Sequence, residues 1–298
     1  MVTRRRRKAL VPWAFLAPFG VLFVVFFVAP IGYAIYQSLL TTKRSGALGL
    51  GGSRTVFAGL ANYASALDST AFLESLGRVL LFAVVQVPVM ILLATTLALL
   101  LDAASAKWPS FFRAAYFLPY GVPGVIATIL WGFLYVPGIS PIIDLAAAAG
   151  LHVDPLGSST VLWSIANIVT WAFAGYNMLV IIAQLKSIPG ELYEAATVDG
   201  ARPWQVVWHV KLPLVRPAIV LTTVFTIIGT LQLFAEPQVL RPITAAIGVS
   251  YTPNLSAYTE AFANNNYGLA AAEAVLLALG AFVLSFGFLH LVGRGGRR

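Results

Sequence analysis

The chain has 298 residues, of which 59% are hydrophobic and 10% are charged, and its mean hydropathy is +0.85. No soluble fold buries so large an apolar share, so an ordinary soluble domain is excluded and an integral membrane protein is predicted. The formal charge is +8, and the lack of cysteine excludes disulfides and thiolate metal sites.

Six apolar runs are each long enough to cross about 30 Å of hydrocarbon as a helix. They lie at about 13–36, 77–101, 114–136, 161–185, 218–236 and 268–292. Barrel strands would be about ten residues long and would alternate in polarity. The runs therefore predict an all-α integral membrane protein with one six-helix transmembrane domain over 13–292, a basic tail at 1–12 and a second tail at 293–298.

The first run follows the basic segment "TRRRRKAL" and could be mistaken for a secretory signal. Its apolar part is longer than the apolar region of a signal sequence, which has about 7–15 residues, and no small-residue cleavage site follows it. We therefore expect a helix that is retained.

Basic residues are distributed unequally between the polar segments. Most of the 19 Lys and Arg residues fall in the two tails and in the segments 102–113 and 186–217, which lie on one predicted side. The other side holds Lys43, Arg44, Arg54 and Arg241. Because cytoplasmic loops are enriched in Lys and Arg, both termini and the 186–217 loop are predicted to be cytoplasmic. The charge needs no nucleic-acid partner to explain it.

Three segments are predicted on the outer side. Residues 38–73 contain "SGALGLGGSR" and are expected to form a glycine-rich loop, without the Lys-Ser or Lys-Thr of a phosphate-binding loop. Within 137–160, "SPIIDLAAAAGL" predicts a short helix with Ser140 as its N-cap, Pro141 first and Gly150 just past its end. Residues 237–267 are expected to be loop-like, with one short helix.

The cytoplasmic segment 189–217 predicts two short helices joined by a tight turn. "ELYEAATVD" is rich in helix formers, and Gly200 supplies a left-handed stop. Pro203 suits the first position of a second helix, which Leu212-Pro213 is expected to end. Trp204, Val207, Trp208 and Lys211 recur on one face of that helix.

Two interpretations of this helix pair remain open on physical grounds. Small Ala195 and Ala196, with acidic neighbours and two tryptophans, fit a docking site for a protein partner. An amphipathic loop on the lipid surface, with the tryptophans as interfacial anchors, fits equally well.

The same segment carries a longer pattern: Glu194-Ala195-Ala196, then Asp199-Gly200-Ala201, then Leu212-Pro213. This pattern resembles the EAA signature of permease subunits of binding-protein-dependent ATP-binding-cassette importers. The stretches "FFRAAYFLPYGVPGVIATILWGFLY" and "NNNYGLAAAEAVLL" resemble the carbohydrate-uptake branch, so the likeness covers about 110–292.

The resemblance implies a coupling helix that docks on a nucleotide-binding subunit. Through this helix, the ATP-driven closure of the nucleotide-binding dimer would change the conformation of the permease. The residues at matching positions are Glu194, Ala195, Ala196, Asp199, Gly200, Leu212 and Pro213. It also implies a second permease as heterodimer partner, two ATPase subunits that bind ATP and Mg, an extracytoplasmic solute-binding protein and the bacterial cytoplasmic membrane. No cofactor is expected on this chain itself.

Two features depart from the family pattern. The loop after the fifth run reads "LRPITAAIGVSYTPN" where a Gly-Gly-Pro is common, and Trp208 stands where Phe is common. The first departure lies in the loop that the resemblance assigns to the outer gate.

Polar and aromatic side chains inside the apolar runs are candidates for a sugar path, because a sugar offers hydroxyls at its edge and C–H groups at its face. Helical spacing places four of them on roughly one face of the fourth run. The candidates are Asn167, Thr170, Trp171 and Asn177, with Gln86, Gln232 and Glu236 in other runs. Packing between helices explains such residues equally well. Arg78 is expected to pair with Glu74.

Other functions find little support. The three histidines lie in separate segments, and neither a catalytic motif nor the G-x-x-x-x-G-K-[ST] phosphate-binding motif occurs, so the chain is not expected to be an enzyme or to bind nucleotide. Glycerol phosphate, a polyol or a similar solute remains an alternative to a sugar. A passive channel would have no reason to carry a coupling loop.

Overall fold

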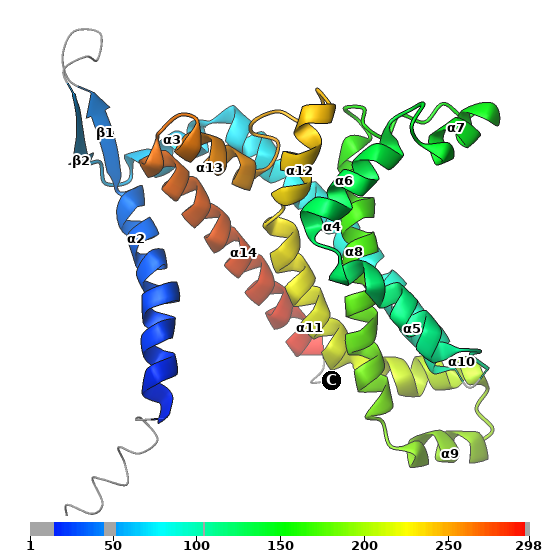
Figure 1. The fold of residues 1–298 in the computed structure, drawn as a ribbon. Helices are drawn as coiled ribbons and strands as arrows, with labels where there is room; N and C mark the ends of the chain where they lie inside the picture. Colours follow the sequence, from blue (N-terminus) through cyan, green and yellow to red (C-terminus); the bar gives the residue numbers. More distant parts are fainter. Residues whose placement is uncertain (1–14, 45–51, 104, 296–298) are drawn as a thin grey trace, which may run out of the picture. The chain divides into compact units, whose positions relative to one another are not determined.

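The computed structural model describes residues 15–44, 52–103 and 105–295, and these are mostly helical (Figure 1). The chain divides into two compact units. Unit 1 comprises Met1–Thr70 and Ala257–Leu276, and unit 2 comprises Ala71–Ser256 and Leu277–Arg298. The predicted 1–12 tail and residues 296–298 lie outside the described residues.

The described part of unit 1 begins with an apolar helical stretch, Phe15–Ser38, that is long enough to cross a membrane. Its middle is a π-helical turn, η1 (Val24–Val28), followed by α2 (Ala29–Ser38). The wider turn adjoins Pro30, whose ring supplies no N–H to the helix. Large apolar side chains such as Phe19 and Phe26 are exposed along it, as expected of a helix that faces lipid or a partner.

A β-hairpin follows in the segment that was predicted to be only a loop. Strand β1 (Leu40–Arg44) pairs antiparallel with β2 (Ser53–Phe57), with Leu40 opposite Phe57. Helix α3 (Ala61–Asp68) then packs against the hairpin base, where the Asn62 amide donates to the carbonyls of Ser38 and Leu40 at 2.7 and 2.8 Å. The prediction missed these elements because each is short, although threonine and valine favour strands. Most of the glycine-rich tip lies outside the described residues.

Three long helices contain predicted membrane runs. Helix α4 (Thr70–Asp102) contains the second run, α8 (Val161–Lys186) the fourth and α14 (Tyr267–Gly295) the sixth. Among the described residues, five helices are long and apolar enough to cross a membrane, or up to six if one bent pair counts as a span.

The bent pair corrects the prediction of a single helix at 114–136. Helix α5 (Pro109–Phe117) continues as a 3₁₀ turn, η3 (Leu118–Gly121), and α6 (Gly124–Tyr135) then leaves at an angle of 98°. Val122 is extended at φ −83°, ψ 125°. A residue before proline avoids the helical region, so Pro123 explains why the helix breaks here.

The fifth run is also organised differently from the prediction. Helix α11 (Leu212–Leu231) ends five residues early, and α12 (Ala235–Leu240) with η5 (Arg241–Ile243) follows a short break. Leu212-Pro213 does not end the preceding helix, because α10 (Pro203–Val206) continues through a π-helical turn, η4 (Val207–Lys211), into α11. Proline in the first turn of α11 costs little, since those N–H groups need no helical acceptor.

Two of the segments predicted to lie outside contain short helices. Helix α7 (Pro141–Ala148) confirms its prediction: the Ser140 hydroxyl accepts from the Ile143 N–H at 3.2 Å, and Gly150 has φ +80°. Helix α13 (Pro253–Phe262) is a short helix of the kind expected within 237–267.

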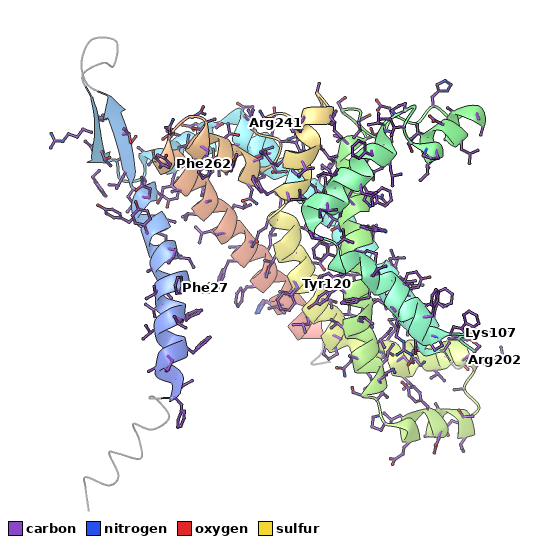
Figure 2. All side chains as sticks on the ribbon, in the orientation of Figure 1. Phe27, Lys107, Tyr120, Arg202, Arg241 and Phe262 are labelled. Atoms are coloured by element: carbon purple, nitrogen blue, oxygen red, sulfur yellow. The ribbon has the colours of Figure 1, made fainter. Side chains whose placement is uncertain are left out.

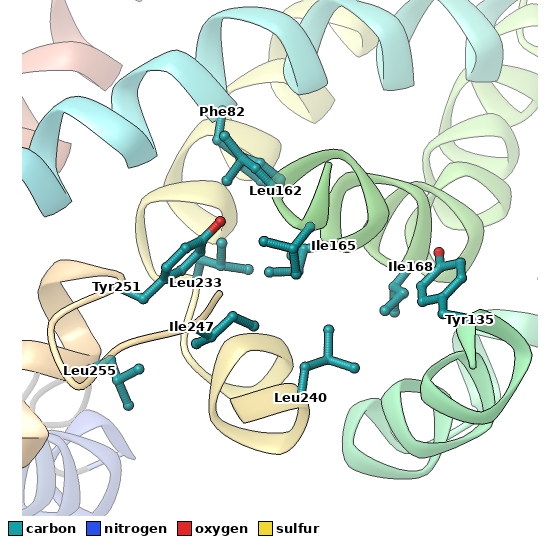
Figure 3. Close-up of a cluster of buried hydrophobic side chains, with 11 residues drawn as sticks. Phe82, Tyr135, Leu162, Ile165, Ile168, Leu233, Leu240, Ile247, Tyr251 and Leu255 are labelled. Atoms are coloured by element: carbon teal, nitrogen blue, oxygen red, sulfur yellow. The ribbon is translucent and has the colours of Figure 1, made fainter. Parts of the chain in front are cut away.

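The packed core of unit 2 lies where α4, α6, α8 and α12 meet (Figure 3). Phe82, Ile165 and Leu240 are each fully buried there. A second cluster joins α4, α8 and the start of α11 through Ala98, Met178 and similar residues. These clusters hold together the helices that carry the polar candidates.

Candidate functional site

The predicted docking segment forms a helix with a defined end. Helix α9 (Gly190–Val198) is followed by Gly200 at φ +76°. The Ala201 N–H donates to the Ala196 carbonyl at 2.9 Å, and the Gly200 N–H donates to the Thr197 carbonyl at 3.0 Å. These two bonds form a Schellman motif, in which glycine is favoured because its φ is positive.

Most residues of the predicted coupling set are exposed. Glu194, Ala195, Asp199 and Gly200 are exposed, and Ala196 is half-buried. Leu212 is half-buried and Pro213 exposed in the first turn of α11, so these two belong to the helix that leads into the membrane and not to a terminating turn.

Large apolar side chains lie exposed next to them. Val198 is 88% exposed, Trp204 56% and Trp208 65%. Apolar side chains this exposed, beside carboxylates, are typical of a surface that a protein or lipid covers.

A half-buried ion pair ties this segment to α4. The Lys211 ammonium lies 2.6 Å from the Asp102 carboxylate, with the two side chains 14% and 18% exposed. The same ammonium lies 5.4 Å from the centre of the Tyr193 ring in α9. Burial, and then the nearby Asp102 charge, raise the pKa of the Tyr193 phenol. The sequence showed no sign of this link.

Helices α9 and α10 lie at one end of unit 2, and α7 lies at the other (Figure 1). Lys107 and Arg202 lie at the α9 end, whereas Arg241 lies at the α7 end (Figure 2). These places match the two sides to which the sequence assigned the three residues.

The four candidates of α8 contact different neighbouring helices. Asn167 donates to the Tyr135 hydroxyl of α6 at 2.9 Å, and the Trp171 ring meets the Trp131 ring edge-on at 5.9 Å. Both therefore face α6. Residues three apart on a helix differ by about 60° around its axis, which is enough to reach a different neighbour.

The remaining two α8 candidates face α4 and α11. Thr170 accepts from the Gln86 amide at 3.4 Å, and Asn177 donates to the Thr226 hydroxyl at 3.2 Å. The Thr230 hydroxyl donates to the Gln86 carbonyl oxygen at 3.2 Å. Gln86 and Asn177 thus connect three helices.

Arg78 does not pair with Glu74 as expected. Its guanidinium donates to the Tyr251 carbonyl at 2.7 Å and lies 4.5 Å above the Tyr251 ring. The ring and the carbonyl together satisfy the cation within unit 2.

A cavity of about 550 Å³ lies beside the break between α11 and α12. Three of the predicted path residues line it: Asn177, Gln232 and Glu236. Asn167, Thr170 and Trp171 do not line it. The cavity therefore separates the candidates into two groups.

Aromatic residues that the sequence analysis missed line the same cavity. The rings of Tyr120 and Tyr176 stack with centroids 4.9 Å apart, and Phe173 meets Tyr120 edge-on at 5.7 Å. A second cavity of about 330 Å³ shares Tyr120, Phe173 and Glu236 with the first. The signal that could have located Tyr120 is its place in "PYGVP", where the helix bends.

No group of three or more His, Cys, Asp or Glu side chains suited to a metal ion occurs among the described residues.

Residues 63–294 match the model of a protein family described as "Binding-protein-dependent transport system inner membrane component". The match covers most of the chain, and it includes α9, the break between α11 and α12 and the residues that line both cavities.

Curated relatives align over most of their length. The chain is 32% identical to the sn-glycerol-3-phosphate transport system permease protein UgpA of Agrobacterium fabrum, over 93% of this chain and 94% of the relative. It is 33% identical to the lactose transport system permease protein LacF of Rhizobium radiobacter, over 75% and 74%. It is 27% identical to the arabinooligosaccharides transport system permease protein AraP of Halalkalibacterium halodurans, over 96% and 89%.

The fold is similar to that of a chain in a bacterial ABC transporter involved in the import of the acidic polysaccharide alginate. The TM-score is 0.82 and the identity 20%, with 98% of each chain covered. A second structure of a bacterial alginate transporter, in complex with a pentasaccharide-bound periplasmic protein, gives a TM-score of 0.78 at 21% identity.

Proposed function

Because the chain belongs to the family of inner-membrane components of binding-protein-dependent transport systems, we propose that it is the permease subunit of an ATP-driven sugar importer. It forms half of the translocation path, and a second, similar permease forms the other half. Two ATPase subunits bind ATP and Mg, and a solute-binding protein delivers the sugar from outside the bacterial cytoplasmic membrane.

The topology follows from the charge distribution. The end of unit 2 that carries α9, α10, Lys107 and Arg202 faces the cytoplasm, and the end with α7 and Arg241 faces outward. The bent pair of α5 and α6 counts as one span, which gives six spans and places both termini in the cytoplasm.

One observation carries the coupling role: the Schellman turn at Gly200 holds α9 as an exposed, acid- and alanine-lined helix beside two exposed tryptophans. We assign Glu194, Ala195, Ala196, Asp199 and Gly200 to the contact with an ATPase subunit. Leu212 and Pro213 transmit the movement of the ATPase subunit into α11, because α10, η4 and α11 follow one another without a loop.

The ion pair gives the movement a second route. Lys211 joins η4 to the end of α4 through Asp102, and the Tyr193 ring of α9 contacts the same ammonium. A displacement of α9 therefore acts on both α4 and α11, the two helices that hold Gln86 and Thr226.

The experiment is ATP-driven uptake of labelled sugars by the full complex in proteoliposomes, with Gly200→Trp compared with wild type. Gly150→Trp is the matched control: Gly150 also has a positive φ, ends a short helix by the same pair of hydrogen bonds and has open space where a side chain would lie. Both variants carry the same backbone strain and bulk.

We expect Gly200→Trp to abolish uptake and to uncouple ATP hydrolysis from the sugar, and Gly150→Trp to retain both. Uptake that survives the Gly200 change would remove the loop as the transmission point. Uptake that persists without ATP or the ATPase subunits would favour a passive channel.

A further inference from the structure

We infer that the cavity beside the break between α11 and α12 binds an uncharged saccharide, with Tyr120 and Glu236 as its main contacts. The inference rests on the proposed importer function and adds the charge class of the substrate. It also assigns a specificity role to Tyr120, which the sequence analysis did not single out.

The first observation is the aromatic wall. Tyr120 stacks on Tyr176 and meets Phe173 edge-on, so three rings stand together on one side of the cavity. The C–H face of a pyranose or furanose packs on such a ring, whereas a compact anion such as phosphate has no apolar face to offer it. The stacking on Tyr176 also holds the Tyr120 ring in place before a ligand arrives.

The second observation is the polar content of the lining. Amide and hydroxyl groups of Asn177, Thr226, Thr230 and Gln232 line the cavity with the Glu236 carboxylate. Amides and hydroxyls both donate and accept, and a carboxylate accepts from sugar hydroxyls. This set matches the edge of a neutral sugar.

The third observation is the sign of the charge. No Lys, Arg or His occurs among the described residues that line either cavity, and the one carboxylate among them is Glu236. A phosphate or uronate brought beside this carboxylate would meet like charge at low dielectric with no cation from this chain to offset it. Anion sites in proteins are built instead from Arg, Lys or backbone N–H groups.

The position of these residues gives them influence over passage. Tyr120, Phe173 and Glu236 line both the larger and the smaller cavity, so they lie where the two adjoin. A solute that moves from one cavity to the other passes these three residues. The relative UgpA is named for glycerol 3-phosphate and the structural neighbour for alginate, and both of these solutes are anions. This chain is inferred to differ from both proteins in the charge of its substrate.

The test uses the full complex in proteoliposomes and two solute pools. One pool contains neutral mono- to pentasaccharides and polyols, including lactose and arabino-oligosaccharides. The other contains sugar phosphates, glycerol 3-phosphate and uronate oligosaccharides. Mass spectrometry of the lumen after ATP addition identifies what has accumulated.

Accumulation from the neutral pool alone is expected. Accumulation of a phosphate or uronate would overturn the inference and leave the importer function standing. No ATP-dependent accumulation from either pool would overturn the importer function itself, and the inference with it.

Variants assign the contacts. Glu236→Gln should lower uptake of the neutral solute about tenfold, because a charge-assisted hydrogen bond becomes a neutral one. Tyr120→Ala should lower uptake by a similar factor, whereas Tyr120→Phe retains the ring and should remain within about twofold of wild type. Glu74→Gln is the matched control, because it removes an exposed carboxylate that lines neither cavity.

Assembly of each variant is checked by gel filtration of the complex, so that a folding defect is recognised. Wild-type uptake by a correctly assembled Glu236→Gln or Tyr120→Ala complex would show that these residues do not contact the solute. An equal loss in Glu74→Gln would show that the effect is not specific to the cavity.

Discussion

Lys211 and Asp102 are 109 residues apart in the sequence, yet the Lys211 ammonium donates to the Asp102 carboxylate at 2.6 Å. The pair joins the end of α4 to the π-helical turn η4, and Tyr193 of α9 contacts the same ammonium. Three elements of the proposed coupling region therefore meet at one half-buried charge. The contribution of this ion pair to the stability of the region can be tested by substitution.

Replacing Lys211 by Met should lower the free energy of unfolding by about 2 kcal/mol, because a half-buried Asp102 carboxylate is left without its partner. Denaturant titration of the purified complex in detergent measures the loss. The double variant with Asp102→Asn should recover part of it, since neither charge then remains. Lys107→Met, at an exposed lysine of the same end, should stay within about 0.5 kcal/mol of wild type. Additive effects of the two single changes would contradict the ion-pair explanation.

Trp208→Ala should weaken binding of the ATPase subunit without destabilising the permease. The side chain is 65% exposed, so its removal leaves no cavity in this chain. Aromatic anchors at interfaces contribute about 2 kcal/mol or more, which corresponds to a dissociation constant about 30-fold higher. The constant is measured with the permease in nanodiscs and the isolated ATPase subunit, and unfolding temperature is recorded in parallel.

The matched control for that measurement is Trp163→Ala in the first turn of α8, where the ring is 40% exposed. We expect its dissociation constant to equal that of wild type. Unchanged affinity in Trp208→Ala would instead favour the second interpretation of the loop, in which its tryptophans rest on lipid.

Gly175→Ala should disrupt the packing of α8 against α5. A methyl group at Gly175 would clash with the Tyr116 carbonyl oxygen, so the backbone of one helix must move. We expect a loss of about 2–3 kcal/mol or failure of the complex to assemble. Gly77→Ala in α4 has nothing within 4 Å of the new methyl and should be neutral or slightly stabilising. The unfolding temperatures of the two variants are compared. Equal temperatures would refute the close contact between Gly175 and Tyr116.

Gln86→Leu should cost about 1 kcal/mol of stability, because it removes the amide that bridges Thr170 and Thr230. A double-mutant cycle with Thr230→Val isolates the direct bond. Its expected coupling energy is about 0.6 kcal/mol, the average for hydrogen bonds between membrane helices. A coupling energy of zero would indicate that the two groups bond to water instead.

Several features could be predicted from the sequence because local physics determines them. Apolar runs of sufficient length gave α4, α8 and α14, since no other structure satisfies the backbone in lipid. The end of α9 at Gly200 and the cap of α7 at Ser140 followed from single residues whose backbone preference or side-chain oxygen acts within a few positions. The coupling motif was recognisable because its residues lie close together in the sequence, within 194–213.

The sequence analysis misjudged two places where proline affects a helix. Pro119 and Pro123 indicate a kink at most, and the sequence does not give its angle; the structure turns α6 by 98° because Val122 becomes extended. Leu212-Pro213 was read as a helix end, but proline in a first turn removes no necessary donor, so α11 continues from α10 and η4.

The sequence alone determined that the chain is a bundle of apolar helices with a helix pair at its basic end and polar groups within its spans. Tertiary structure decided which of those polar groups meet. Asn167 and Trp171 turn to α6, Thr170 and Asn177 turn to α4 and α11, and Tyr120 joins Glu236 at a cavity. Helical periodicity gives only the direction in which a side chain leaves its own helix axis. Which neighbour stands at that angle depends on how the helices cross, and close contacts such as Gly175 against Tyr116 set that crossing.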